Sequence, residues 1–160
     1  MSTTTVAAIR DRMIALVRAL VPTVESGTKF VPYREQLDFR SWAEAHPDAC
    51  LRRFSIATRG QVSPPEVTNT DVERVWVEME AVVAYPVNSR FGERALASLH
   101  DVIASDLQQM EHRIGTNGYA LYAASNPAAT VLTLDTDREN GPVVMFGVLV
   151  LRVGFFRSMA

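Results

Sequence analysis

Two carboxylates, Glu78 and Glu80, are the best candidates for a catalytic pair in this sequence by their type and spacing. The segment Val75–Tyr85 alternates apolar and polar residues, which predicts a half-exposed β-strand. Residues two apart on a strand share a face, so the two carboxylates could approach each other as a general acid and base must. A hairpin register that places Arg53 opposite Glu78 favours another interpretation, a cross-strand ion pair worth roughly 0.2–1 kcal/mol.

The histidines and the cysteine form no reactive group by their spacing. Of His46, His100 and His112, the last two lie about 120° apart around a predicted helix, so they do not converge on a ligand. Cys50 is the single cysteine, and no base lies near it in the sequence. We expect it to be a buried small hydrophobe. Without a disulfide framework, assembly in a reducing, intracellular compartment is favoured.

Motifs for common cofactors and metals are missing. The sequence contains no G-x-S-x-G, G-x-G-x-x-G, G-x-x-x-x-G-K-[ST], H-E-x-x-H or C-x-x-C motif. The stretch 135–141 superficially resembles a calcium loop, but a loop of the EF-hand type needs glycine at its sixth position and glutamate at its twelfth. Those positions hold Asn140 and Phe146, so a solvated hairpin turn is favoured. We therefore expect no enzymatic activity, no metal and no cofactor.

Helical periodicity defines the elements that must position these residues. Apolar residues recur at three- and four-residue steps before Pro22, and Thr4 or Thr5 can cap this segment through its hydroxyl. A second long segment keeps this spacing until Gly115, a typical helix stop. The predicted helices cover Val6–Leu20, a short segment Asp38–His46 that Pro47 closes, and a stretch that opens at Asn88 or Ser89 and ends at Gly115.

Alternating apolar and polar residues predict the strands. The first carries Cys50, Phe54 and Ile56 on one face, and the last is apolar on both faces. The stretch Gly60–Asp71 contains paired prolines, which exclude regular pairing, and is far longer than a two-residue turn, so it predicts a projecting hairpin arm. The predicted strands cover Cys50–Thr58, Val75–Tyr85, Ala129–Asp135 and Val143–Arg157.

These elements predict an α+β fold, in which two main helices pack on a roughly four-stranded, mainly antiparallel sheet with a long β-hairpin arm. Two amphipathic helices cover only one face of a sheet. The second apolar face of the last strand then needs another cover, and a neighbouring subunit is the simplest candidate. The alternative is that one helix packs on each face within a single chain.

Composition limits the classes of function. The chain has 160 residues, is 48% hydrophobic and carries a formal net charge of −2, which predicts one domain spanning residues 1–160. This charge balance disfavours binding of nucleic acid through its phosphates. The longest apolar run, Val143–Leu151, is far shorter than the roughly 18 residues of a membrane span. The N-terminal segment has acidic and basic residues inside its first apolar stretch, which a signal peptide excludes.

The order of the elements resembles that of a known family. The resemblance rests on the segments IRDRMIALVRAL, CLRRFSIAT, VERVWVEMEAVVAYPV, ERALASLHDVIASDLQQMEHRI and VVMFGVLVLRVGFFR. In this order the chain is similar to the tail terminator, or tail-completion (neck), proteins of tailed bacteriophages and related tail-like particles. The resemblance covers nearly the whole chain, although it consists of patterns rather than signature motifs. The arm segment SPPEVTNT has no counterpart in it.

The resemblance implies a structural protein without catalytic residues. Such a protein forms a homo-oligomeric, hexameric ring that caps the tail tube, stops its polymerisation and joins it to the head-tail connector or stopper protein. It implies a place in the tail or neck of the virion after assembly in the host cytoplasm, with no membrane partner. DNA then passes through the lumen without specific binding, so we expect an acidic or neutral lumen. The candidates for an acidic lumen are Glu78, Glu80, Asp101 and Asp106.

Two segments are expected to contact the neighbouring subunit or the tube. Prolines stiffen the arm and its valines give it apolar anchors, while the last strand offers its second apolar face. The candidate interface residues are Val62, Pro64, Pro65 and Val67 in the arm, and Leu149, Val150, Arg152, Phe155, Phe156 and Arg157 in the last strand. The alternative is a small-ligand-binding or regulatory α+β domain that dimerises through its sheet, with the last strand lining an apolar pocket.

Overall fold

A computed structural model describes residues 5–34, 38–61, 66–67, 72–87, 96–116, 121–123, 130–133 and 144–158. Its helices are α1 (Val6–Arg18), α2 (Phe39–Ala45) and α3 (Leu96–Thr116). Its strands are β1 (Val31–Pro32), β2 (Arg53–Gln61), β3 (Glu66–Val67), β4 (Val72–Pro86), β5 (Leu121–Ala123), β6 (Thr130–Thr133) and β7 (Val144–Ser158). The expected α+β class is confirmed.

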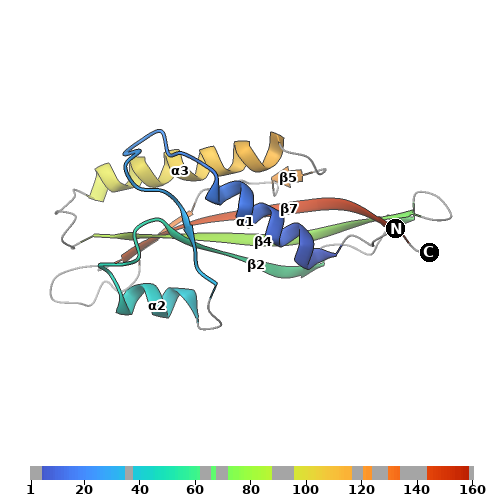
Figure 1. Cartoon of the computed structure of the whole chain (residues 1–160), viewed down its shortest axis with the longest axis horizontal. Coiled ribbons are helices and arrows are strands. Elements are labelled where there is room, and N and C mark those ends of the chain that lie inside the picture. The colour runs from blue at the N-terminus through green and yellow to red at the C-terminus, as the bar shows by residue number, and fades with distance from the viewer. Residues whose placement is uncertain are drawn as a thin grey trace.

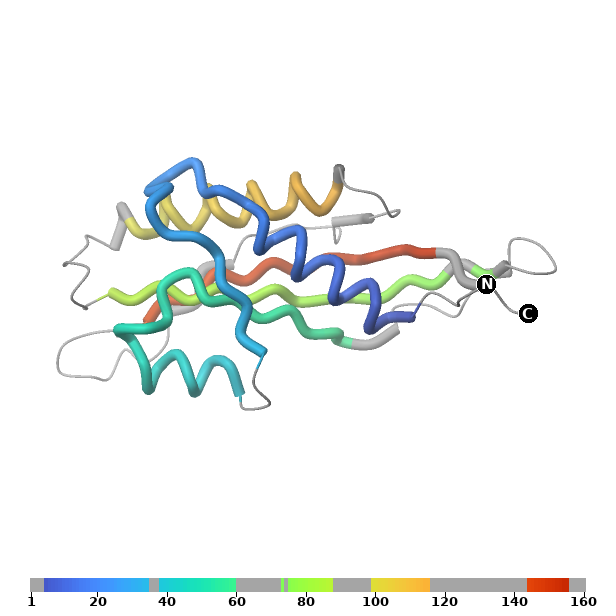
Figure 2. Tube along the Cα trace, in the orientation of Figure 1, coloured from blue at the N-terminus to red at the C-terminus, as the bar shows by residue number. Residues whose placement is uncertain are grey.

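All described strands belong to one sheet in the order β1-β2-β4-β7-β5, with β3 also paired to β4 and β6 also paired to β7. Every pair is antiparallel except β1 with β2. The centre of the sheet is the long β4–β7 pair, whose register runs from Val72 opposite Ser158 to Pro86 opposite Val144. Figure 2 shows these two strands side by side along the length of the molecule.

The local signals for two helices are confirmed. The hydroxyl of Thr5 accepts a hydrogen bond from the backbone N–H of Ala8 at 3.1 Å, which caps α1. The carboxylate of Asp38 accepts one from the backbone N–H of Arg40 at 3.2 Å, which caps α2. Helix α3 continues one residue past Gly115. Its expected start at Asn88 or Ser89, like the turn at 135–141, lies outside the described residues.

Helices α1 and α3 cover one face of the sheet (Figure 1). Alternate residues of β4 from Val75 to Tyr85 point into this layer, as expected from their period of two. Gly147 of β7 lets α3 approach closely, because a Cβ atom there would lie 2.8 Å from Cγ2 of Ile103. The core of this layer consists mainly of Ile9, Met13, Val17, Phe54, Ile56, Met79, Leu99, Ile103, Leu107, Leu149, Leu151, Val153 and Phe155.

The cover of the second face differs from the expectation. Helix α2 of the same chain packs there through Phe39 and Ala43, against the end of the sheet that carries Val82, Ala84 and Phe146. A neighbouring subunit is therefore not needed at this end, and the prediction that it covers the second apolar face of the last strand is wrong there. Figure 1 shows α2 beneath one end of the sheet only, so the other end of this face lies beyond α2.

The hairpin register also differs from the expectation. Gly60, and not Arg53, lies opposite Glu78. Phe54 pairs with Val83, so the whole of β2 is displaced along β4 from the expected register, and a β-bulge between Thr58 and Gly60 adds a shift of one residue. Cys50 lies before β2 and packs in the α2 layer, whereas Phe54 and Ile56 share the other face as expected. Within the expected arm, β3 pairs with β4, while residues 62–65 and 68–71 lie outside the described residues.

Candidate functional site

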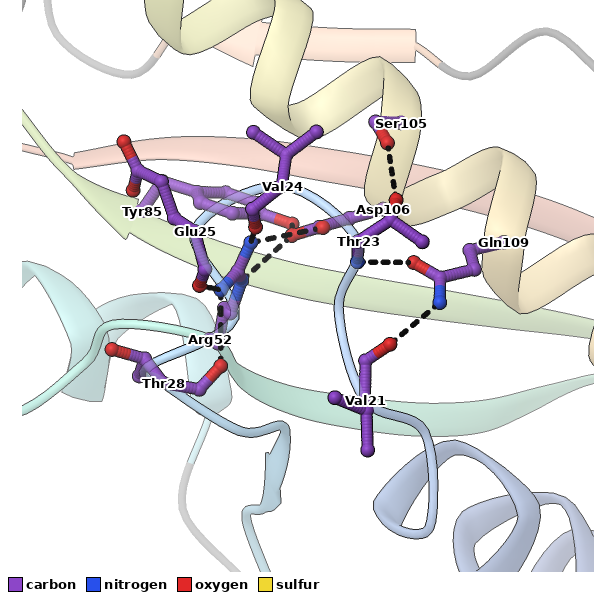
Figure 3. Close-up of polar contacts among 10 residues, drawn as sticks. All are labelled: Val21, Thr23, Val24, Glu25, Thr28, Arg52, Tyr85, Ser105, Asp106 and Gln109. Atoms are coloured by element: carbon purple, nitrogen blue, oxygen red, sulfur yellow. Dashed lines mark hydrogen bonds and ion pairs between the residues drawn. The ribbon is translucent and has the colours of Figure 1, made fainter.

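A buried ion pair joins the helical layer to the sheet (Figure 3). Arg52 donates from Nε and Nη2 to the two carboxylate oxygens of Asp106, at 2.9 and 3.0 Å. Its remaining donors reach backbone carbonyls of Val24 at 2.6 Å, Glu25 at 2.6 Å and Thr28 at 3.0 Å. These contacts can satisfy all five N–H groups of the guanidinium. The two charged side chains are 2% and 0% exposed, so no substrate reaches them.

Tyr85 completes this cluster from β4. Its hydroxyl donates to Oδ2 of Asp106 at 2.7 Å. Burial raises the pKa of Asp106, while the hydrogen bonds from Arg52 and Tyr85 oppose that rise. Burial and the neighbouring carboxylate raise the pKa of Tyr85 as well. Arg52 and Glu25 both have positive φ, 55° and 52°, which non-glycine residues rarely adopt without compensating contacts. The cluster therefore fixes the segment 21–28 against α3.

A second set of contacts fixes the same segment. Gln109 of α3 accepts from the backbone N–H of Thr23 at 3.2 Å and donates to the carbonyl of Val21 at 2.7 Å. An open pocket of about 340 Å³ lies beside these contacts and is lined by polar residues. Strand β7 contributes none of its lining, so it differs from the pocket expected for a ligand-binding domain. The lining residues are Thr23, Ser105, Gln108, Gln109 and His112.

The part of the sheet beyond α2 presents a second surface, which we call the open face. It consists of Ala57, Trp76, Glu78, Val150, Arg152 and Gly154, which the strand register places on the α2 side of the sheet, and of Arg59, which binds Glu78 from the β-bulge. No described helix lies over most of it, and Val150, at its border, packs against the cluster beneath α2. The six-membered ring of Trp76 lies on Gly154, where a Cβ atom would be 2.5 Å from Cζ3 of the indole. Val150 and Trp76 are half-buried, and Arg152 is exposed.

Glu78 of this surface and Glu80 at its border with α2 both form ion pairs. Arg59 lies 3.1 Å from Glu78 and 3.7 Å from Glu80, and Arg40 of α2 lies 3.2 Å from Glu80. Their side chains are partly exposed, so each pair contributes at most about 1 kcal/mol. The predicted pair of Arg53 with Glu78 is therefore wrong: the cross-strand ion pair joins Arg59 to Glu78, and the second partner of Glu80, Arg40, comes from helix α2. Both carboxylates serve as ion-pair partners here.

The structure divides the expected interface residues. Leu149 and Phe155 are each 1% exposed and pack against α1 and α3 in the chain's own core, so their prediction as interface residues is wrong. Val150 and Arg152 lie on the open face. Three arm residues lie outside the described residues: Val62, Pro64 and Pro65. Three further residues lie in strands, but their side chains are outside the described part of the structure: Val67, Phe156 and Arg157.

The four expected lumen residues do not share one surface. Glu78 lies on the open face and Glu80 at its border with α2, whereas Asp101 is exposed on α3. Asp106 is fully buried against Arg52, so its assignment to a solvated acidic lumen is wrong. The sequence does contain a signal for the burial of Asp106, because this residue lies at helical spacing on the same apolar helix face as Ile103 and Met110. Arg52 and Tyr85 carried no comparable signal for their part in the cluster.

Metal-binding geometry is absent from the part of the chain that the structure describes, where no three histidine, cysteine, aspartate or glutamate side chains gather to hold an ion. His100 and His112 are exposed on α3. His46 stacks on Trp42 with ring centroids 5.1 Å apart. Cys50 is buried beside α2 as expected, and burial raises the pKa of its thiol to about 12.

Cys50 is expected to resist alkylation in the native protein. Reaction requires the thiolate, and a pKa of about 12 against the ordinary 9.0 lowers the thiolate fraction at pH 8 by about 1000-fold. Iodoacetamide labelling followed by mass spectrometry, in buffer and in urea, measures this protection. The raised pKa also means that its contribution to stability is complete below pH 9 and is lost as pH rises from 9 towards 12. Equal labelling rates in both solutions would contradict the burial.

In comparisons with known proteins, no protein-family model matches the chain and no curated protein sequence is similar enough to match it. None of the described helices is long and apolar enough to cross a membrane. Inferences about function therefore rest on the geometry of the described residues. It offers a fully paired internal cluster, which fixes the fold, and an open face that carries Trp76 and Arg152, two residue types enriched where proteins bind each other.

Proposed function

We propose that this protein is a structural, non-enzymatic ring component of a phage or phage-like tail. In this function it forms a homo-oligomeric ring, most simply a hexamer, which caps the tail tube and stops its polymerisation. The ring joins the tube to the head-tail connector or stopper protein, and DNA passes its lumen without specific binding. The protein belongs to the tail or neck of the virion and assembles in the host cytoplasm.

The observation that supports this proposal most directly is the open face. Strands β4 and β7 are each fifteen residues long, and one end of this pair extends beyond the helix that covers the rest of the face. Tryptophan and arginine are enriched among the residues that dominate protein interfaces, and the open face carries Trp76 and Arg152 together. A long sheet with one partly covered face suits a subunit that stacks against its neighbours.

The charges of the described surface do not favour retention of DNA by a ring of these subunits. Arg59 and Arg40 are paired with Glu78 and Glu80, which lowers their attraction for phosphate, and Arg52 is buried. The whole chain carries a formal net charge of −2. A ring of such subunits presents no uniformly basic wall from these arginines to hold the phosphate backbone.

The purified protein is expected to form rings of defined stoichiometry, alone or on the tube. Size-exclusion chromatography with light scattering measures the subunit number, and negative-stain electron microscopy shows the ring. Incubation with tube protein from the same particle is expected to give tubes of limited length with a ring at one end. A protein that stays monomeric in both conditions, and leaves tube length unchanged, would refute the proposal.

For the small-ligand-binding or regulatory alternative, the described residues offer the polar pocket beside α3 in place of the apolar pocket expected along β7. A domain of this kind would form dimers in light scattering, and ligand addition would raise its melting temperature. Dimers whose melting temperature rises with a small molecule, and which leave tubes unaffected, would favour the alternative over the ring.

A further inference from the structure

A ring subunit needs two different surfaces that fit each other, because a repeated heterologous contact closes into a ring. The open face lies on the α2 side of the sheet. Helix α1 lies on the opposite side, where Ile9, Met13 and Val17 face the core. The side of α1 that points away from the sheet carries the exposed residues Ala8, Asp11 and Ala15, and we call it the outer face of α1.

We infer that the open face of one copy packs against the outer face of α1 in the next copy, with Arg152 of the first copy paired to Asp11 of the second. This inference rests on the proposed function, which it deepens by naming the two surfaces of the subunit contact. Since the surfaces lie on opposite sides of one subunit, each copy can bind one neighbour through each surface.

Charge complementarity supports this pairing. Arg152 and Asp11 are both exposed, and within the described part of the chain neither takes part in an ion pair. Each has an oppositely charged residue nearby: Glu78 lies opposite Arg152 in the strand register, and Arg18 follows Asp11 by two turns on α1. Two surfaces that each carry both charges favour one relative orientation, because the reversed orientation places like charges together.

The shapes of the two surfaces also agree. The indole of Trp76 lies on Gly154, so an aromatic ring forms part of the open face. Ala8 and Ala15 flank Asp11 at helical spacing. Their short side chains leave room for a flat partner between the longer, exposed side chains of Arg12 and Arg18. A contact with a central tryptophan and a flanking ion pair matches the composition of stable protein interfaces.

A charge exchange tests the pairing with variants that leave the core untouched. Arg152→Glu and Asp11→Arg are each expected to weaken self-association about 10-fold or more, because each places like charges across the contact. The double variant restores the pair in reversed order and is expected to assemble within about 3-fold of wild type. Light scattering over a concentration series measures assembly, and circular dichroism with a melting curve confirms folding of each variant.

Matched controls are Asp101→Arg on α3 and Lys29→Glu before β1, both at exposed positions outside the two surfaces. Asp101→Arg changes the net charge as Asp11→Arg does, and Lys29→Glu changes it as Arg152→Glu does. Both controls are expected to leave assembly unchanged. If the wild type forms rings and neither Arg152→Glu nor Asp11→Arg weakens them, this inference is wrong while the proposed function stands. If both single variants weaken assembly and the double variant does not recover, the pairing is likewise refuted. A wild type that remains monomeric with the tube protein overturns both.

Discussion

Replacing Arg52 with methionine is expected to lower the free energy of unfolding by about 3–5 kcal/mol. The substitution leaves the carboxylate of Asp106 buried without its counter-charge, and it removes the donors for the carbonyls of Val24, Glu25 and Thr28. Domains of this size are stable by roughly 5–15 kcal/mol, so this loss is a large share of the total. Urea unfolding followed by far-ultraviolet circular dichroism measures it.

The adjacent Arg53 provides a matched control. Its guanidinium lies over the ring of Trp42 at 5.5 Å, and its side chain is only half-buried. Arg53→Met is therefore expected to cost about 1 kcal/mol or less. In the double variant Arg52→Met with Asp106→Leu no charge remains unpaired, so its loss is expected to fall short of the summed single losses by about 1–3 kcal/mol. Strictly additive losses would show that the two side chains do not act as a pair.

Replacing Phe146 with alanine is expected to cost about 3–5 kcal/mol. Phe146 is fully buried between β7 and α2, with its ring centroid 6.2 Å from that of Phe39 in edge-to-face contact. The cavity left by this change removes the main support of α2 on the sheet. Because Trp42 of α2 packs on Tyr33 with centroids 4.9 Å apart, a weakened α2 also changes the near-ultraviolet circular dichroism of these rings.

Val150→Ala is the control for this prediction, because Val150 lies on the same face of β7 near the border of the α2 layer. It is half-buried and is expected to cost about 1 kcal/mol or less in the monomer. Guanidinium titration of the two variants separates the covered from the open part of the face. Equal losses at both positions would mean that α2 does not define the boundary of the open face.

Several parts of the fold were predictable because they depend on neighbours in the sequence. The cap of α1 at Thr5 and the short helix after Asp38 follow from local hydrogen bonds between a side chain and the helix N-terminus. The alternation of β4 and the two apolar faces of β7 follow from the period of a strand, and the structure places both as expected. The α+β class follows from the order of these elements.

The candidate site was predictable only in part. Val150 and Arg152 fall on the open face because alternation along β7 assigns them to the side opposite Leu149 and Leu151. Alternation cannot tell which side α1 and α3 will cover, because β7 is apolar on both faces. The sequence therefore predicted Leu149 and Val150 equally as interface residues, although Leu149 is buried in the core.

Backbone periodicity and contacts a few residues apart were enough to predict the helices and the four longest strands, and which of their residues share a face, whereas the short strands β1, β3 and β5 were not predicted. Three features became visible only in the folded chain: the bulge beside Arg59, the cover that α2 gives to one end of the second face, and the pairing of Arg52 with Asp106 across 54 positions of the chain. These features depend on contacts between distant segments. Their energies come from burial and from the loss of water around charges, which no local pattern records.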